Sequence, residues 1–286
     1  MEWVDRLNES IQYIENHLTE ELDYRRLGQI ACCSSCHFQR MFTYMANMPL
    51  SEYIRRRKMS LAAVDLQNGG KVVDVAAKYG YSSPTAFNRA FRAVHGIPPS
   101  AAQALGTPVK SFPPLTFVLA VEGAAELNYR IETREAIRVV GLSAPLRQTI
   151  EENFTLVPGM WQEAASSGAL EELAAMMEGP PMGLLGVSAC GDGEQWRYLI
   201  AAATGKAAGR FEEYQIPAAV WAIFPGTGTN RSMQELERRV VTQWFPTSGY
   251  EYDDGPDIEV YLNPDPSNAQ YELWIPVRKK EEKSFF

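Results

Sequence analysis

The chain has 286 residues, of which 45% are hydrophobic and 22% are charged, with a formal net charge of −8 and a pI near 5.1. This length suits two domains with separate hydrophobic cores, since one domain typically takes about 100–200 residues. No apolar run approaches the roughly 18 residues that span a membrane, and the charged start MEWVDR lacks a signal-peptide core, so we expect a cytoplasmic protein without a membrane partner.

The charge is divided unevenly along the chain. Residues 1–110 contain 13 Lys and Arg against 10 Asp and Glu, a net charge of +3, whereas residues 111–286 contain 14 against 25, a net charge of −11. The first part is therefore the one suited to a polyanion such as DNA.

The first 46 residues predict three helices. The first is indicated by apolar residues three and four apart, which are Val4, Leu7, Ile11, Ile14 and Leu18. Asp23 is a typical N-cap for a second helix over residues 24–31. A third helix, over residues 35–46, turns an apolar stripe inward and presents Cys36, Gln39, Arg40 and Thr43 outward.

The cysteines give no sign of a cofactor. Cys32, Cys33 and Cys36 lie within five residues, which is atypical of a disulfide framework. No second cysteine pair or nearby histidine pair completes a zinc site around them. We therefore expect reduced thiols, with neither metal nor cofactor.

Residues 72–94 predict a second pair of helices. Val72, Val75, Ala76 and Tyr79 recur at helical spacing, Gly80 stops that helix, and Ser83 and Pro84 cap and start the next. The helix from Pro84 buries one apolar stripe and leaves a polar face, which is made of Thr85, Asn88, Arg89 and Arg92. The segment 50–68 predicts a helix with Ser51 as its cap, which connects the two pairs and carries the basic run 55–58.

The two helix pairs repeat at a separation of about 49 residues when Arg40 is laid over Arg89. A short helix, a tight turn and a second helix with outward polar groups is typical of a helix-turn-helix that enters the DNA major groove. A rigid connector can hold two such helices about 34 Å apart, one turn of duplex. The alternative is that these faces are ordinary solvated helix surfaces.

The second half begins after the Pro- and Gly-containing segment 106–114, which reads as a linker. Strands are predicted over residues 115–121, 127–131, 137–146, 183–189, 196–203, 220–224, 258–262 and 271–277. Helices are predicted near 158–165, 170–177 and 233–244. The order gives two strand-helix-strand-strand units around a shared sheet, with a cleft expected at the seam between them.

A carboxylate stands out on one predicted strand. Alternation over residues 257–262 sends Asp257, Glu259 and Tyr261 to one face and the apolar residues to the other. We expect Glu259 to lie in the cleft among ring residues, which are Trp161, Tyr198, Trp221, Phe224, Tyr261 and Trp274. Rings with one carboxylate can hold a hydrophobic cation. The alternative is that the rings are core and Glu259 is solvated.

The first half resembles a known family. The segments CSSCHFQRMF, YIRRRKMSLA and VVDVAAKYGYSSPTAFNRAFRAVHGIPPS are similar to the DNA-binding domain of AraC/XylS-type transcription regulators. The resemblance implies an all-α tandem helix-turn-helix domain over residues 1–105 that binds double-stranded promoter DNA. It also implies that bases are read by the outward positions Cys36, Gln39, Arg40, Thr85, Asn88 and Arg89.

The second half resembles another family. The segments PGMWQEA, IPAAVWAIFPG, WFPTSGYEYDDGPDIEVY and YELWIPV are similar to the GyrI-like, SHS2-type effector-binding domain. The resemblance implies an α+β domain of two βαββ units over residues 115–286. In relatives that sense cationic drugs, an acidic residue on the matching strand sits in an aromatic pocket, which implies Glu259 here.

Together these features predict a ligand-responsive bacterial transcription regulator, with promoter DNA, a small hydrophobic or cationic effector and RNA polymerase as partners. Two alternatives stay open. The acidic half could be a protein-binding module without a small ligand, which an exposed aromatic patch would favour. It could instead be a hydrolase using Glu259 as a general base, although all three histidines lie in the first half.

Overall fold

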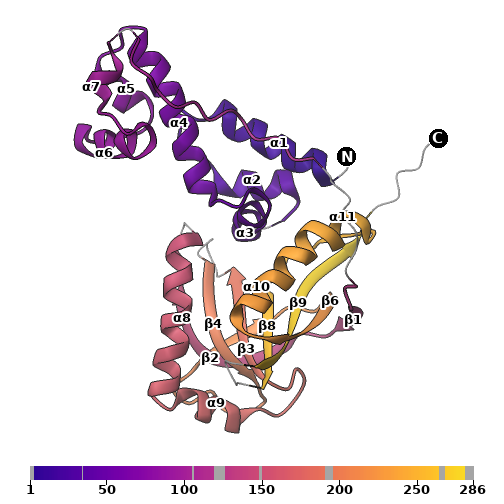
Figure 1. Cartoon of the computed structure of the whole chain (residues 1–286). Coiled ribbons are helices and arrows are strands. Elements are labelled where there is room, and N and C mark those ends of the chain that lie inside the picture. The colour runs from indigo at the N-terminus through magenta and orange to yellow at the C-terminus, as the bar shows by residue number, and fades with distance from the viewer. Residues whose placement is uncertain are drawn as a thin grey trace, which may run out of the picture. The chain divides into compact units, whose positions relative to one another are not determined.

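The structure is a computed structural model that describes residues 3–33, 35–104, 106–118, 126–147, 150–190, 196–263 and 268–280. The chain divides into two compact units, Met1–Val121 and Glu122–Phe286 (Figure 1). The first unit is helical, and the second is built on one antiparallel sheet with helices. The multidomain architecture expected from the sequence is therefore confirmed.

The first three helices are α1 (Trp3–Asn16), α2 (Tyr24–Ala31) and α3 (Ser35–Ala46). Asp23 caps α2 as expected, because its Oδ1 accepts from the backbone N–H groups of Arg25 and Arg26 at 2.9 and 3.1 Å. Helix α2 packs against both α1 and α3, and the buried residues of the three helices include Leu7, Ile11, Ile14, Leu27, Phe38, Met41 and Phe42. Helices α2 and α3 form the first helix-turn-helix.

Helix α4 (Leu50–Gln67) connects to the second helix-turn-helix, α5 (Val72–Lys78) and α6 (Pro84–His95), with the short α7 (Pro99–Ala102) behind it. Ser83 caps α6 by accepting from the Ala86 N–H at 3.2 Å, and Gly96 ends the helix with φ +80°. The cap of α4 was assigned to Ser51, but Pro49 occupies the N-cap position and Ser51 lies inside the helix. Phe87 and Phe91 of α6 are fully buried against α4 and α5.

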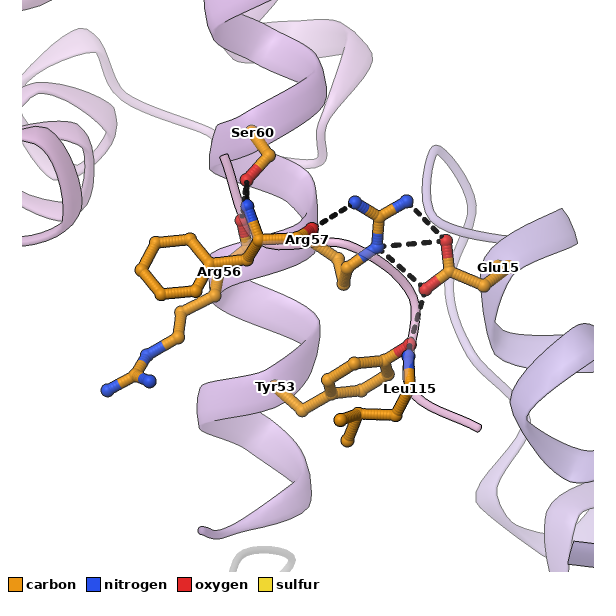
Figure 2. Close-up of polar contacts among 7 residues, drawn as sticks. Glu15, Tyr53, Arg56, Arg57, Ser60 and Leu115 are labelled. Carbon is orange, nitrogen blue, oxygen red and sulfur yellow. Dashed lines mark hydrogen bonds and ion pairs between the residues drawn. The ribbon is translucent and has the colours of Figure 1, made fainter. Parts of the chain in front are cut away.

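Residues 106–118 differ from the sequence prediction. A strand was expected over residues 115–121, but residues 115–118 form no strand, and 119–125 lie outside the described residues. The reason is that side chains of the helices, and no neighbouring strand, pair with this backbone. The Leu115 N–H donates to the Tyr53 hydroxyl, and both backbone groups of Phe117 bond to Asn8 (Figure 2 shows the first of these).

Acidification is expected to destabilise the first unit through His95. Burial lowers the pKa of His95, whose Nδ1 accepts from the Lys110 N–H while Nε2 bonds to the Met59 carbonyl. As the pH falls, His95 therefore takes up a proton in the unfolded chain before it does so in the folded chain. The contribution of neutral His95 to folding stability is complete above about pH 6.5 and is lost below it.

The test of this prediction is the urea midpoint of unfolding. In the wild-type protein it should fall between about pH 7.5 and about pH 5.5, and the fall should be smaller in His95→Gln. Equal falls in the two proteins would show that other groups are responsible.

The second unit contains strands β1 (Arg130–Arg134), β2 (Ile137–Pro145), β3 (Leu184–Cys190), β4 (Trp196–Ala203), β5 (Glu212–Ile216), β6 (Ala219–Gly228), β7 (Tyr250–Tyr252), β8 (Asp257–Asn263) and β9 (Ala269–Lys279). Their order in the sheet is β1-β6-β9-β8-β3-β4-β2-β5, with β7 paired to β9. The two expected units, β2-α-β3-β4 and β6-α-β8-β9, therefore meet at the β3–β8 pair. The two short strands β5 and β7 were not predicted, and residues 191–195 and 264–267 lie outside the described residues.

The helices α8 (Ile150–Ser166), α9 (Ala169–Met176) and α10 (Asn230–Arg239) pack on one face of this sheet (Figure 1). That face carries Val140, Tyr198, Ile200 and Tyr261. The other face buries a cluster made only of strand residues, including Leu185, Ile223 and Val260. A π-helical turn, Val240–Trp244, continues α10 where one uninterrupted helix was expected. Among the described residues, no helix is long and apolar enough to cross a membrane.

Candidate functional site

The outward face of α6 is built as the sequence predicted. Phe87, Phe91 and Val94 point into the core, which leaves Thr85 and Arg89 exposed and Asn88 half-buried. The side chain of Arg89 makes no hydrogen bond or ion pair with any other described residue. A guanidinium group held ready on a rigid helix can donate two parallel hydrogen bonds to guanine, and an asparagine amide can do the same with adenine.

The matching face of α3 is less exposed. Gln39 and Arg40 are both half-buried, and Arg40 already takes part in a contact within the protein. Cys36 lies in α3, but its side chain is outside the described residues. The Thr43 hydroxyl is turned back to the Gln39 carbonyl at 2.8 Å. The predicted base-reading positions are therefore more exposed on α6 than on α3.

Glu259 lies at the centre of a hydrogen-bonded group on the helix-covered face of the sheet. Its Oε2 accepts from the hydroxyls of Tyr198, at 3.1 Å, and Tyr261, at 2.9 Å. Trp161 of α8 donates its Nε1–H to the Tyr198 hydroxyl at 3.0 Å, and its ring meets the Tyr261 ring edge-on at 4.9 Å. The structure thus brings four of the seven predicted ligand-site residues together.

A glycine makes room for this group. Gly186 on β3 stands directly opposite Glu259 on β8, so both lie at the seam between the two βαββ units. A methyl group at Gly186 would overlap the Tyr198 hydroxyl and come within 2.8 Å of Glu259 Oε2. The absence of a side chain there lets Tyr198 reach across β3 from β4. The sequence signal for this role was the glycine inside a strand.

Helix α10 adds two residues that the sequence analysis missed. Met233 Sδ lies 3.7 Å from the Tyr261 hydroxyl, and Glu237 follows one helical turn later, buried on the same helix. Burial, then the charges of Glu259 and other neighbours including Glu237, raises the pKa of Tyr261. Tyr261 therefore stays a neutral hydrogen-bond donor. The missed signal was a glutamate four residues after Met233 in the apolar stripe of α10.

Two predicted residues lie elsewhere. Trp221 and Trp274 are packed with Ile258 and Val260 on the opposite face of the sheet from Glu259, with their rings 5.9 Å apart. Side chains alternate along a strand, so Ile258 and Val260 face away from Glu259, and the two tryptophans that pack against them lie on that opposite face. The assignment of Trp221 and Trp274 to the Glu259 site is therefore wrong.

Phe224 shares the face of Glu259 but belongs to another cluster. Register places Phe224, Leu273 and Glu259 in one row across three strands, so Leu273 separates the other two. The ring of Phe224 contacts Trp244 at 5.0 Å and Tyr129 at 5.9 Å. Phe224 therefore lies near the site without being part of the group around Glu259.

The Glu259 group has the chemistry of a binding site for an organic cation. It combines one carboxylate, two tyrosines and an indole, all partly or fully buried, and a cation can interact with both the charge and the ring faces. Within the described ranges no group of three or more His, Cys, Asp or Glu residues is placed to bind a metal ion.

Comparison with known proteins matches each half separately. Residues 127–278 match the family described as the GyrI-like small molecule binding domain, and residues 27–104 match a helix-turn-helix domain family. The chain is 39% identical over 95 residues to the transcriptional activator AarP of Providencia stuartii, which covers 33% of this chain and 70% of AarP.

Two further likenesses cover one half each. The chain is 35% identical over 83 residues to the regulatory protein SoxS of Salmonella typhimurium, which covers 29% of this chain and 78% of SoxS. The structure of SAV2435 bound to tetraphenylphosphonium superposes with a TM-score of 0.47 at 18% identity, over 53% of this chain and 94% of that one.

Proposed function

The chain belongs to the AraC-type helix-turn-helix transcription regulators and carries a GyrI-like small-molecule-binding domain, and we propose that it binds promoter DNA through α3 and α6 under the control of a hydrophobic cation. In this proposal Gln39, Arg40, Thr85, Asn88 and Arg89 contact bases, together with Cys36. The cation occupies the Glu259 group and changes the affinity for DNA.

The DNA half of the proposal is supported by the exposed polar face of α6 and by the net charge of +3 in residues 1–110. Basic residues on the connector supply phosphate contacts that position the protein without reading sequence. Because the matched relative AarP is named a transcriptional activator, the proposal includes RNA polymerase as a partner of the DNA-bound chain.

Replacing Arg89 with alanine is expected to cost about 1–3 kcal/mol on a specific site and to relax the preference at one base pair. The reason is that bidentate recognition of guanine needs the guanidinium fork. The measurement is fluorescence anisotropy on a duplex selected in vitro by the wild-type protein and on a random duplex.

Arg92→Ala is the matched control, because Arg92 is exposed on the same helix but nearer its C-terminal end. Base contacts come mainly from the N-terminal residues of a recognition helix, so Arg92→Ala should affect both duplexes equally. An equal loss on both duplexes for Arg89→Ala would show that Arg89 touches only phosphate.

The ligand half of the proposal rests on one observation, the carboxylate of Glu259 enclosed by Tyr198, Tyr261 and Trp161. These rings are buried or half-buried, which favours a small ligand over a protein partner that would need an exposed aromatic patch. The matched relatives are transcription regulators, so the proposal assigns no catalytic role to Glu259.

The test of effector control is to measure DNA affinity of the full chain with and without tetraphenylphosphonium, a hydrophobic cation that cannot donate hydrogen bonds. Binding of the cation is followed separately by quenching of tryptophan fluorescence, with tetraphenylborate as the anionic control. We expect the cation to quench saturably and to change DNA affinity, since control requires different affinities for two states of the protein. Equal responses to the anion and the cation would contradict the proposal.

A further inference from the structure

Residues 107–118 run along α4 in the opposite direction, held by a series of hydrogen bonds. Thr107 O accepts from Gln67 Nε2, the Phe112 N–H donates to Ser60 Oγ at 3.0 Å, and the Leu115 N–H donates to the Tyr53 hydroxyl. The segment therefore follows α4 from its C-terminal end to its N-terminal end. We call residues 107–118 the strap.

At one end the strap packs on the second helix-turn-helix. Val109 and Phe112 join the core cluster that contains Phe87 and Phe91 of α6. The Lys110 N–H donates to His95 Nδ1 at the end of α6, at 3.1 Å. The strap is thus tied directly to the second recognition helix.

At the other end the strap reaches the first helix-turn-helix. Asn8 of α1 donates to the Phe117 carbonyl at 3.0 Å and accepts from the Phe117 N–H at 2.8 Å, so one side-chain amide pairs both backbone groups of Phe117. The Phe117 ring meets the ring of Phe42, on α3, edge-on at 5.9 Å. We call Asn8, Phe42 and Phe117 the clasp.

The middle of the strap is anchored at a largely buried ion pair (Figure 2). Arg57 of α4 binds Glu15 of α1 through Nη2 at 2.6 Å and also donates to the Phe112 carbonyl. The Tyr53 hydroxyl donates to Glu15 at 2.6 Å, and burial raises the pKa of Tyr53, so this donor stays protonated. The same side chains thus hold α1, α4 and the strap together.

Helix α4 joins the two helix-turn-helix units in sequence, and the strap joins them a second time in space. Two connections at different points restrict rotation of one unit about the other, which a single helix does not. A duplex presents successive base pairs at different angles around its axis, so the angle and separation between α3 and α6 decide which half-site spacing fits both.

We propose that the strap sets the spacing between the two half-sites that the protein recognises. In this proposal the clasp is the specificity-determining contact between the strap and the first helix-turn-helix. This inference rests on the proposed DNA binding and needs no small ligand. It assigns a function in DNA recognition to a segment outside the two recognition helices.

The test uses the full chain and a duplex selected in vitro by the wild-type protein, with versions in which one base pair is inserted or removed between the half-sites. Wild-type protein is expected to lose about tenfold in affinity on each altered duplex, the cost of one poorly fitted contact. Asn8→Ala and Phe117→Ala should reduce that loss to less than about threefold, since the first helix-turn-helix can then change its position relative to the second.

Val118→Ala is the matched control, because Val118 is the next residue of the strap and is 80% exposed. It should discriminate between duplexes as the wild-type protein does. Thermal unfolding by circular dichroism checks that each variant is folded, and Phe117→Leu serves in place of Phe117→Ala if the latter is not.

Two results separate the inference from the function on which it rests. If both clasp variants keep the wild-type ratio of affinities between the selected and the altered duplexes, the strap does not set the spacing. If the wild-type protein selects no specific duplex, the proposed DNA recognition itself fails, and the inference fails with it.

Discussion

Replacing Glu259 with glutamine is expected to weaken binding of tetraphenylphosphonium by about 30- to 150-fold, which is about 2–3 kcal/mol. Glutamine keeps the shape of the side chain and one oxygen acceptor for the hydroxyls of Tyr198 and Tyr261. The substitution therefore removes the charge and leaves the rings in place. Isothermal titration calorimetry with the full chain measures the effect.

Glu135→Gln is the matched control, since it makes the same change of charge at an exposed glutamate between β1 and β2. It should bind the cation as the wild-type protein does. DNA affinity without the cation should be the same in all three proteins. Unchanged cation binding in Glu259→Gln would remove Glu259 from the site and leave only the rings as ligand contacts.

Replacing Arg57 with alanine is expected to destabilise the first unit by about 3–5 kcal/mol, because it leaves the carboxylate of Glu15, whose side chain is only 17% exposed, without its cation. Arg57 is 8% exposed and forms three contacts with Glu15, at 2.6, 2.9 and 3.0 Å. Its loss also removes the donor to the Phe112 carbonyl. Urea unfolding followed by circular dichroism at the helix band measures the change.

The neighbouring Arg56 provides the control for this prediction. Arg56 pairs with Glu52 one turn away, and its side chain is 35% exposed, so Arg56→Ala should cost less than about 1 kcal/mol. The double variant Glu15→Ala, Arg57→Ala should be more stable than the sum of the single losses predicts, since no lone charge is left. A loss below about 1 kcal/mol in Arg57→Ala would show that water solvates the Glu15 carboxylate well enough to replace the ion pair.

Local signals explain why the helices of the first unit were predictable. Asp23, Ser83 and Gly96 act on the backbone within a few residues, so their effect can be read from the sequence around them. The strap could not be found in this way. Asn8 and Phe117 are 109 residues apart, and the run 115–118, made of β-branched and apolar residues, has the composition of a strand.

The ring residues of the second unit show the same limit. Trp221 and Phe224 lie in β6, whose central residues are buried on both faces of the sheet, so no polar residue marks which side faces the helices. Glu259 could be placed, because polar and apolar residues alternate along β8. The position of Gly186 opposite it depends on strand pairing, which local pattern does not encode.

The β3–β8 pair has a consequence for how far the two βαββ units can resemble each other in sequence. The strand order is symmetric about this antiparallel pair, and its middle residues, Gly186 and Glu259, stand opposite each other. Two units of identical sequence paired in this way would place the same residue opposite itself, and two facing carboxylates repel. A single acidic site therefore requires that the two units differ at this position, and the pair of glycine and glutamate satisfies that requirement.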